Sequence, residues 1–446
     1  MGRESTPTIR RPADVEEPDR RVALDCLAAG IRAAEPSTVV TERVALEGDT
    51  LIVDGHRYDL GTYDRVLVVG GGNAAGTAAE ALESVLGDRI DGGAVVTDTP
   101  GATERVDVLP GDHPIPSERN VQNTRRVVDV AASATPDDLL IGVVTGGGSA
   151  LLSAPADGVH LDDLQHVTEE LLASGADIEE INAVRKHCSD LKGGQLATTS
   201  ATVVGLVFSD VVGDRLDVVA SGPLTPDGST FAEALAVLQH YDIDVPGAVE
   251  TRLRRGEGGD HPETPGPFDP AFESVHQHVL ANGMTALYSA ADAAVDAGYE
   301  PLVLGSRIRG EAREAAKVLA GIAEESAATG TPVEPPAVLL SGGETTVTIR
   351  GDGKGGPNQE FVLSAALELS DGNVVVAGID TDGIDGNSDA AGGIASASAA
   401  EPRGAAQDAL AANDAGGFLA DRDALVVTGP TGTNVNDLRV LVVPDG

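Results

Sequence analysis

An apolar run enters a glycine-rich turn at residues 65–76, which read Arg-Val-Leu-Val-Val-Gly-Gly-Gly-Asn-Ala-Ala-Gly. Alanines and leucines then recur at helical spacing to about residue 86, so the segment predicts a strand, a glycine turn and a helix. The same order returns where the apolar runs 93–97, 139–144 and 203–208 each lead into a polar or glycine-containing loop. Strands that alternate with helices favour mostly parallel sheets covered on both faces, an α/β/α arrangement of three layers.

The second half of the chain resumes this alternation after a break in composition. Residues 246–270 are rich in proline, glycine and charge, which predicts a linker. Beyond it, the apolar pattern predicts strands near 301–304, 337–341, 374–377, 425–427 and 440–443, and helices near 284–297, 309–327 and 359–369. We therefore expect two α/β domains, residues 1–245 and 271–446.

The chain is strongly acidic but has the composition of a folded protein. Its 446 residues carry a formal net charge of −41, yet 41% of them are hydrophobic, which argues against disorder. Lysine is nearly eliminated, and acidic residues are spread along the whole length. Such a surface is typical of a halophilic protein, because molar salt screens charge repulsion to within a few ångströms. No basic stripe exists to bind a nucleic-acid backbone, so nucleic acid is not an expected partner.

Cysteine content and hydropathy bear on the compartment. The two cysteines, Cys26 and Cys188, are too few for a disulfide framework and fit a reducing environment. The N-terminus has no apolar signal region, and no apolar run approaches the length that spans a bilayer. We expect a cytoplasmic protein with no membrane partner.

Two glycine loops follow predicted strands, at the edge of the sheet where open α/β folds bind ligands. Gly72 and Asn73 lie in a G-x-G-x-x-A pattern that fits a dinucleotide pyrophosphate, although a tight turn with close helix packing has the same spacing. Residues 145–149 read Thr-Gly-Gly-Gly-Ser, and consecutive N–H groups with no side chains to crowd them suit a phosphate. Ser149 either caps the following helix or donates to that phosphate.

A short segment gathers scarce cations. If residues 181–190 are helical, four polar side chains share one face, namely Asn182, Arg185, Lys186 and Ser189. Lys192 follows and precedes two glycines, which leaves its ammonium beside exposed backbone amides. Most lysines are solvated surface charges, but a chain that discards lysine elsewhere favours a phosphate contact for this one.

Two acidic turns are candidates for a metal or for substrate hydroxyls. Asp210 and Asp214 flank a glycine after a predicted strand, and Mg²⁺ takes one or two such carboxylates plus phosphate oxygens, although Asx turns have the same pattern. Asp380, Asp382 and Asp385 form a second turn that resembles part of a calcium loop but lacks its closing glutamate. Magnesium or substrate hydroxyls therefore suit the second turn better than calcium.

Further polar loops complete the set of candidates. His113 either hydrogen-bonds a substrate carboxylate or rigidifies its own loop. Other polar groups follow strands in the loops that contain Glu344, Asn358 with Glu360, and Asn434. Together the loops predict a site for a hydroxylated small molecule. A Ser-His-Asp hydrolase is disfavoured, because no G-x-S-x-G elbow follows a strand.

The loops taken together resemble the glycerate 2-kinase family, whose C-terminal part is the MOFRL domain, here about residues 336–446. The resemblance covers nearly all of the chain from about residue 60 onward. It rests on a series of motifs: Gly146-Gly-Gly-Ser-Ala-Leu-Leu152, Asn182-x-x-Arg185-Lys186-His-x-Ser189-x-x-Lys192-Gly-Gly, Ser209-Asp210-x-x-Gly213-Asp214, Ser221-Gly-Pro223, Ser341-Gly-Gly-Glu344, Asn358-Gln-Glu360, Asp382-Gly-x-Asp385-Gly and Thr428-Gly-Pro-Thr-Gly-Thr-Asn434.

This resemblance implies ATP-dependent phosphorylation of D-glycerate on its C2 hydroxyl, with Mg²⁺. It also implies that the active site lies in a cleft between the two α/β domains. Phosphoryl transfer is mostly positioning and electrostatics, which agrees with the cations, glycine loops and acidic turns. The expected catalytic residues are Lys192, Asp210, Asp214 and Arg185, and the two aspartates are also the expected metal ligands. The expected nucleotide-binding residues are Gly146, Gly147, Gly148, Ser149, Gly72, Asn73, Lys186 and Asn434. The expected substrate-binding residues are His113, Ser221, Glu344, Asn358, Glu360, Asp382 and Asp385.

The chain departs from the family pattern at two positions. Many members have lysine where this chain has Asn73 and arginine where it has Pro357. Either the substrate and rate differ from those of the family, or other cations take over, namely Arg185, Lys186, Lys192 and Lys354. Two other functions stay open, an NAD(P)-dependent hydroxypyruvate reductase that uses the G-x-G-x-x-A loop and a non-catalytic sugar-acid sensor. A homodimer stays open as well.

Overall fold

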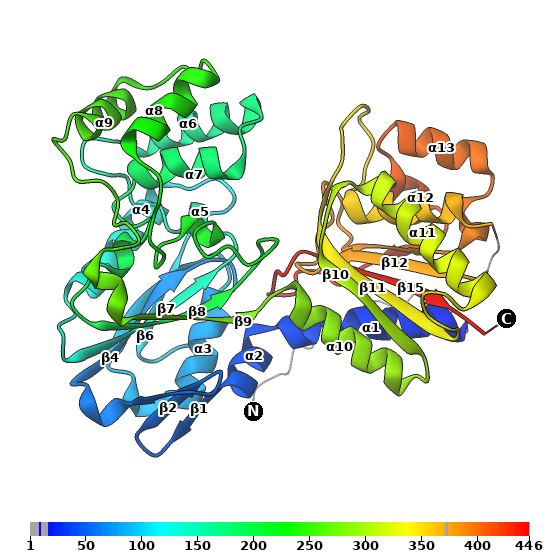
Figure 1. Cartoon of the computed structure of the whole chain (residues 1–446), viewed down its shortest axis with the longest axis horizontal. Coiled ribbons are helices and arrows are strands. Elements are labelled where there is room, and N and C mark those ends of the chain that lie inside the picture. Colours follow the sequence, from blue (N-terminus) through cyan, green and yellow to red (C-terminus); the bar gives the residue numbers. More distant parts are fainter. Residues whose placement is uncertain (1–8, 10–16, 371–372, 446) are drawn as a thin grey trace. The chain divides into compact units, whose positions relative to one another are not determined.

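The structure is a computed structural model that describes residue 9, residues 17–370 and residues 373–445. It divides the chain into two compact domains (Figure 1). Residues 39–280 form the first, called the N-terminal domain below, and residues 281–446 with residues 1–38 form the second, called the C-terminal domain. Each domain is built on a sheet flanked by helices, so the predicted α/β fold is confirmed. None of the described helices is long and apolar enough to cross a bilayer.

The main sheet of the N-terminal domain has six strands in the order β6-β5-β4-β7-β8-β9. The strands from β4 to β8 pair in parallel and are mostly buried, because helices cover both faces of such sheets. The bounds are β4 (Arg65–Gly71), β5 (Gly92–Thr97), β6 (Val106–Pro110), β7 (Asp138–Thr145), β8 (Thr202–Phe208) and β9 (Val275–Ala281). A small antiparallel sheet of β1 (Val44–Glu47), β2 (Thr50–Val53) and β3 (His56–Asp59) precedes them.

The strand order reverses between β4 and β7. The chain runs outward from β4 through helix α3 (Ala75–Leu86) to β5 and then β6, and returns through α4 (Glu118–Ala132) to β7. Right-handed connections in opposite directions put α3 and α4 on opposite faces of the sheet. The loops after β4 and β7 diverge at such a reversal, which is where open α/β sheets bind ligands.

Four helices form a separate group at one end of the N-terminal domain (Figure 1). They are α6 (Leu161–Ser174), α7 (Ile178–His187), α8 (Phe231–His240) and α9 (Gly247–Glu257). Leu171, Val184, Phe231 and Leu253 are buried in their shared core. α6 and α7 precede β8 in the sequence, and α8 and α9 follow it. The group is therefore inserted into the α/β domain in two segments.

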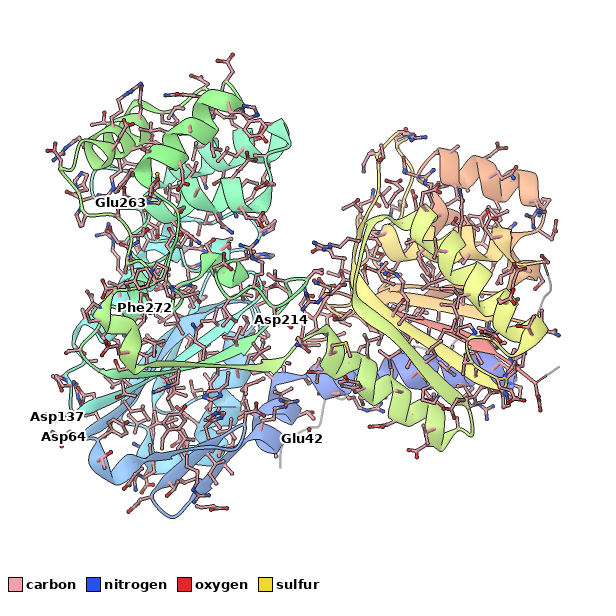
Figure 2. The ribbon with its side chains drawn as sticks, in the orientation of Figure 1. Glu42, Asp64, Asp137, Asp214, Glu263 and Phe272 are labelled. Carbon is pink, nitrogen blue, oxygen red and sulfur yellow. The ribbon has the colours of Figure 1, made fainter. Side chains whose placement is uncertain are left out.

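The predicted linker at residues 246–270 is wrong. Residues 247–257 form α9, which buries Val249 and Leu253 and keeps its charged side chains outside. The following segment is also anchored, because the Glu263 carboxylate accepts a hydrogen bond from the Phe231 N–H (2.9 Å; Glu263 is labelled in Figure 2). Its proline, glycine and charge reflect an exposed surface and not a boundary.

The sheet of the C-terminal domain is mixed. Its order is β10-β11-β15-β12-β13-β14, and only β10 and β11 pair in parallel. The antiparallel partners β13 and β15 lie between the others, so β10, β11, β12 and β14 still share one direction. The bounds are β10 (Glu300–Glu311), β11 (Ala337–Thr346), β12 (Val375–Asp380), β13 (Gly392–Ala395), β14 (Leu425–Val426) and β15 (Asp437–Val443).

Helices cover both faces of this sheet. α11 (Ala312–Thr329) and α12 (Pro357–Glu368) lie on one face, and α1 (Pro18–Ala34) and α10 (Gly283–Asp296) lie on the other (Figure 1). The remaining helices are α13 (Arg403–Ala411) and α14 (Ala415–Ala420) in this domain, α5 (Gly148–Leu151) in the N-terminal domain, and α2 (Pro36–Arg43) at the boundary.

The first domain boundary also differs from the prediction. α1 belongs to the C-terminal domain, where its Gly30 lies against Ala286 of α10 and Leu438 of β15. The pattern of an amphipathic helix does not specify which sheet the helix covers. The sequence therefore could not predict that α1 packs on α10 and β15, which lie far from it in the chain.

Glycine at position 70 is required by the pairing of β4 with β7. A Cβ there would collide with the Val143 backbone, and its φ of 138° disfavours side chains. We expect Gly70→Ala to destabilise the protein by about 3 kcal/mol or more, measured by urea unfolding in high salt. Gly321→Ala is the control: Gly321 lies in α11 with open space around it, so alanine should stabilise by up to about 1 kcal/mol. Equal effects of the two changes would contradict this account.

Candidate active site

The loops after β4 and β7 are joined by hydrogen bonds. The Asn73 N–H donates to the Gly146 carbonyl oxygen (2.8 Å), and the Ala74 N–H donates to Thr145 Oγ1 (3.2 Å). A Cβ on Gly72 would collide with Thr145. The amides that would face a pyrophosphate in a dinucleotide site are therefore used within the protein, and tight packing explains the G-x-G-x-x-A pattern.

Each glycine of the loop after β7 touches a different neighbour. A Cβ on Gly146 would collide with the Asp210 carboxylate, one on Gly147 with Asn73 Oδ1, and one on Gly148 with the Ala220 side chain. The φ of 74° at Gly147 also favours glycine. The three glycines thus admit neighbouring loops, which is a different reason from the open phosphate cradle that the sequence predicts.

Ser149 belongs to a buried hydrogen-bond chain. Its Oγ lies 2.9 Å from Ser221 Oγ, and Ser221 donates to Asn182 Oδ1 (2.8 Å). Because the single hydroxyl hydrogen of Ser221 goes to Asn182, the hydroxyl of Ser149 donates to Ser221. The Ser149 side chain therefore holds the loop, and donors for a phosphate at this point would be backbone N–H groups.

Ser221 is fully buried, so the expected direct contact with substrate is not supported. It lies in a turn where Ala220, Ser221 and Gly222 all have positive φ (51°, 60° and 64°). Such a backbone is costly for alanine and serine, and it persists because the surroundings enforce it. The turn presents the Ala220 side chain to Gly148 and the Ser221 hydroxyl to Ser149.

A cavity of about 540 Å³ lies beside these loops, within the N-terminal domain. It brings together five of the residues that the sequence singles out for the site: His113, Gly147, Ser149, Arg185 and Lys192. The other lining residues come from α5, from α6, from the segment after His113, from the segment around Ser153 and, at Ser189, from the segment after α7.

The cavity has a cationic wall. Lys192 is only 5% exposed, and its Nζ donates to the Leu152 carbonyl oxygen (2.6 Å). Burial and the neighbouring Arg185 lower the pKa of Lys192 to about 7. Burial also lowers the pKa of Arg185, whose guanidinium forms no ion pair with the residues that the structure describes. Two cations without a carboxylate partner favour an anionic ligand.

Lys186 lies elsewhere, so the expected common face of the segment is wrong. α7 ends at His187, and its Asn182 and Lys186 line a second cavity of about 590 Å³, while Arg185 lines the first. Lys186 Nζ donates to Asp227 Oδ1 (3.1 Å), and both side chains are buried. The charge of Lys186 is thus compensated inside the protein, which weakens the prediction that it binds nucleotide.

Asp210 and Asp214 lie on the loop after β8 (Asp214 is labelled in Figure 2). Across the described part of the chain, no three His, Cys, Asp or Glu side chains are placed to hold a metal. Mg²⁺ needs fewer, since it binds one or two carboxylates together with phosphate oxygens and water. The Asp210 carboxylate lies against Gly146, so it would supply an oxygen ligand to Mg²⁺ beside that loop.

Family comparisons agree with this geometry. A family model described as a domain of unknown function (DUF4147) matches residues 22–254, and the MOFRL family model matches residues 337–437. A glycerate 2-kinase from Pyrococcus horikoshii is 38% identical over 433 residues, which cover 95% of this chain and 97% of that protein. The chain belongs to the glycerate 2-kinase family.

Two further relatives support this placement. The crystal structure of a glycerate kinase from Thermotoga maritima superposes with a TM-score of 0.83 at 37% identity and covers 95% of this chain and 99% of that one. A protein from Agrobacterium vitis, provisionally named a hydroxypyruvate reductase, is 42% identical over 392 residues, 85% of this chain and 87% of its own length. The glycerate 2-kinase family thus includes relatives under two names.

The C-terminal domain of this family member holds a second polar cluster. The Asp385 carboxylate accepts hydrogen bonds from the N–H groups of Asn358 (3.0 Å) and Gln359 (2.8 Å) at the start of α12. Burial raises the pKa of Asp385 to about 7, against the effect of these hydrogen bonds. Both oxygens of Asp385 serve the helix start, and Asn358 Nδ2 donates to Asp437 Oδ1 (2.6 Å). Asp385 and Asn358 therefore hold the cluster together.

Crowding of carboxyl groups in this cluster disfavours the charged form of Asp380. Burial raises the pKa of Asp380 well above its usual value, and Asp382 and Asp437 raise it further. Arg439 is completely buried, donates to Asp437 and lies over the Phe361 ring (4.8 Å). Asp382 Oδ1 accepts a hydrogen bond from the Ile384 N–H (2.8 Å) within the same turn, and its role as a substrate ligand stays a prediction.

Three other predicted site residues of the C-terminal domain differ in their burial and hydrogen bonds. Glu360 is buried, accepting from Arg313 (2.7 Å) and Asn413 (2.7 Å), so it is part of the domain's internal structure and the predicted substrate contact is not supported. Glu344 is exposed on β11. Asn434 Oδ1 accepts the Asn436 N–H (2.9 Å) within its own loop.

Sequence reasoning did not single out Asp227, Asp437 or Arg439. A signal existed for Arg439, because a lone cation inside the apolar run 438–443 must find a buried partner. Asp437 is that partner and begins the same strand. No sequence signal indicates that Asp227 pairs with Lys186.

The buried charge of Lys192 should lower the free energy of unfolding of the ligand-free protein, by an amount that depends on pH. Its folded pKa of about 7 lies below the ordinary 10.5, so between these values the unfolded chain binds more protons and stability rises with pH. We expect Lys192→Met to be more stable than the wild type below pH 7, with a gain that shrinks as pH rises toward 10.5. Each unit of pKa shift corresponds to about 1.4 kcal/mol, so the low-pH gain is several kcal/mol. Denaturant unfolding without ligand measures it, and a gain that grows with pH would contradict it.

Proposed function

We propose that this protein transfers the γ-phosphoryl group of ATP to the C2 hydroxyl of D-glycerate and releases ADP and 2-phosphoglycerate. Membership of the glycerate 2-kinase family supports the reaction. The observation that carries the proposal is the pair of cations, Lys192 and Arg185, without carboxylate partners in a cavity beside the loop after β7. Phosphoryl transfer needs such fixed positive charge where negative charge develops.

The residues of this chain divide the work as follows. Lys192 and Arg185 neutralise charge on the phosphoryl group, and the backbone of the loop at Gly147 and Ser149 positions it. Asp210 or Asp214 accepts the proton of the C2 hydroxyl or orients that hydroxyl for attack. Asp210, together with Asp214, would hold Mg²⁺, which when bound neutralises phosphate oxygens.

The two departures from the family pattern increase the role of Lys192. Asn73 Oδ1 is buried against Gly147 and lacks a hydrogen-bond partner among the described residues, so this corner has a polar but uncharged group. Pro357 is the first residue of α12, a position that suits proline because its missing N–H has no helical partner. Lys186 is neutralised by Asp227, which leaves Lys192 and Arg185 as the cations of the cavity.

The reductase alternative finds less support in the geometry. A hydroxypyruvate reductase would place a nicotinamide dinucleotide on the loop after β4, whose Asn73 and Ala74 N–H groups already donate to the loop after β7. The sensor alternative leaves the desolvated charge of Lys192 without a catalytic purpose.

One assay separates the three functions. Purified protein in molar KCl is given D-glycerate, Mg²⁺ and ATP, or hydroxypyruvate and NAD(P)H, and the products are identified. ADP with 2-phosphoglycerate supports the kinase, oxidation of NAD(P)H supports the reductase, and neither supports the sensor. A dependence on Mg²⁺ in the first arm tests the metal.

Lys192 should be needed for turnover. We expect Lys192→Ala to lower kcat by about two orders of magnitude, as for the loss of one transition-state charge contact. Lys317→Ala is the matched control, because Lys317 is exposed on α11 and pairs only with Glu314 of its own helix. Unchanged kcat of Lys192→Ala in molar KCl would remove Lys192 from the mechanism.

Several finer predictions stand beside this proposal. A cytoplasmic location, a halophilic habit and an active site formed between the two domains remain predictions from the sequence, and so does the lack of a nucleic-acid partner. A homodimer remains open.

A further inference from the structure

The cavity beside Lys192 has an apolar end. Ile115 is 69% exposed and Leu172 is 61% exposed, and both line this cavity. Pro114, Pro116 and Leu164 extend the same wall. Single exposed apolar residues are common, but two large ones that line one concave surface with three further apolar residues indicate a ligand with an apolar face.

Two structural elements hold this wall. Residues 113–116 form one side and α6 forms the other, and Gln165 Nε2 of α6 donates to the Pro116 carbonyl oxygen (2.7 Å). This hydrogen bond fixes the distance between the two sides. Thr168 and the exposed Glu169 add polar groups at the same end, which suit the hydroxyls and ring nitrogens of a mostly flat ligand.

Cationic and polar side chains line the same cavity. They include Lys192, Arg185 and Ser149, so a ligand that fills the whole cavity has both an anionic part and an apolar part. A three-carbon hydroxy acid has no apolar face and is far smaller than about 540 Å³, a volume typical of sites for larger ligands. Adenosine phosphates have both features.

We propose that this cavity binds the nucleotide, with the adenosine between residues 113–116 and α6 and the phosphates toward Lys192 and Arg185. The proposal rests on the proposed kinase function and adds to it the position of the base. His113 then borders the nucleotide, which differs from its expected role as a substrate ligand. The glycerate binds outside the apolar end.

Binding measurements isolate the adenosine contribution without requiring turnover. ADP and inorganic pyrophosphate are titrated calorimetrically into the whole protein in molar KCl, and the ratio of their affinities reports on the adenosine. We expect Ile115→Gln and Leu172→Gln each to lower ADP affinity by about tenfold, because each removes apolar contact without adding charge. Pyrophosphate affinity should stay unchanged.

Val318→Gln is the matched control, since Val318 is 62% exposed on α11 and does not line the cavity. In turnover assays the two cavity variants should raise the KM for ATP and leave the KM for glycerate unchanged. A raised KM for glycerate alone, an equal loss of ADP and pyrophosphate affinity, or no change in either affinity would each overturn the assignment.

The outcome for the site is separable from the outcome for the reaction. If the variants lose ADP affinity selectively but the wild type forms no phosphorylated glycerate, the nucleotide site stands and the proposed reaction fails. If the wild type forms 2-phosphoglycerate and the variants keep ADP affinity and the KM for ATP, the reaction stands and the site assignment fails.

Discussion

The contact between the loops after β4 and β7 is the constraint on which the candidate site depends. The Asn73 N–H can donate to the Gly146 carbonyl oxygen because Gly72 lets its loop approach the backbone of residues 145–146 without a Cβ, and because Gly147 leaves room for the Asn73 side chain. Once the loops are joined, Asp210 packs against Gly146 and Ala220 against Gly148. The positions of the metal candidate and of the Ser149 loop follow from this one close approach.

Two buried lysines, one in α7 and one in the loop after it, differ in how their charge is compensated. Lys186 is matched by Asp227, so its charge is satisfied inside the fold. Among the residues that the structure describes, the Lys192 ammonium has one carbonyl oxygen as its partner, and a buried ammonium with that little compensation destabilises the folded state. An anion that enters the cavity supplies the missing counter-charge. The Lys192 ammonium therefore destabilises the ligand-free protein and binds the anion in the complex.

Much of the fold could be read from the sequence, because buried parallel strands appear as continuous apolar runs that end in glycine loops. The runs at 65–69, 139–144 and 203–208 became β4, β7 and β8. The edge strands β6 and β9 are only partly buried and lack such runs.

The site was harder to predict, because side-chain environment depends on tertiary contacts. Helical spacing placed Arg185 and Lys186 together, but cavities on two sides of α7 separate them. Glu360 and Ser221 are polar, as ligand-binding residues are. Only the structure shows that their side chains hydrogen-bond to other residues inside the protein.

The membership of α1 in the C-terminal domain has a consequence for synthesis of the chain on the ribosome. The helix emerges before the N-terminal domain, whereas its packing partners in α10 and β15 emerge only after the whole N-terminal domain has been made. During that interval the apolar face with Leu24, Leu27 and Ile31 has no native surface to cover it. The N-terminal domain can fold as one continuous segment, whereas the C-terminal domain needs segments from both sides of it in the chain.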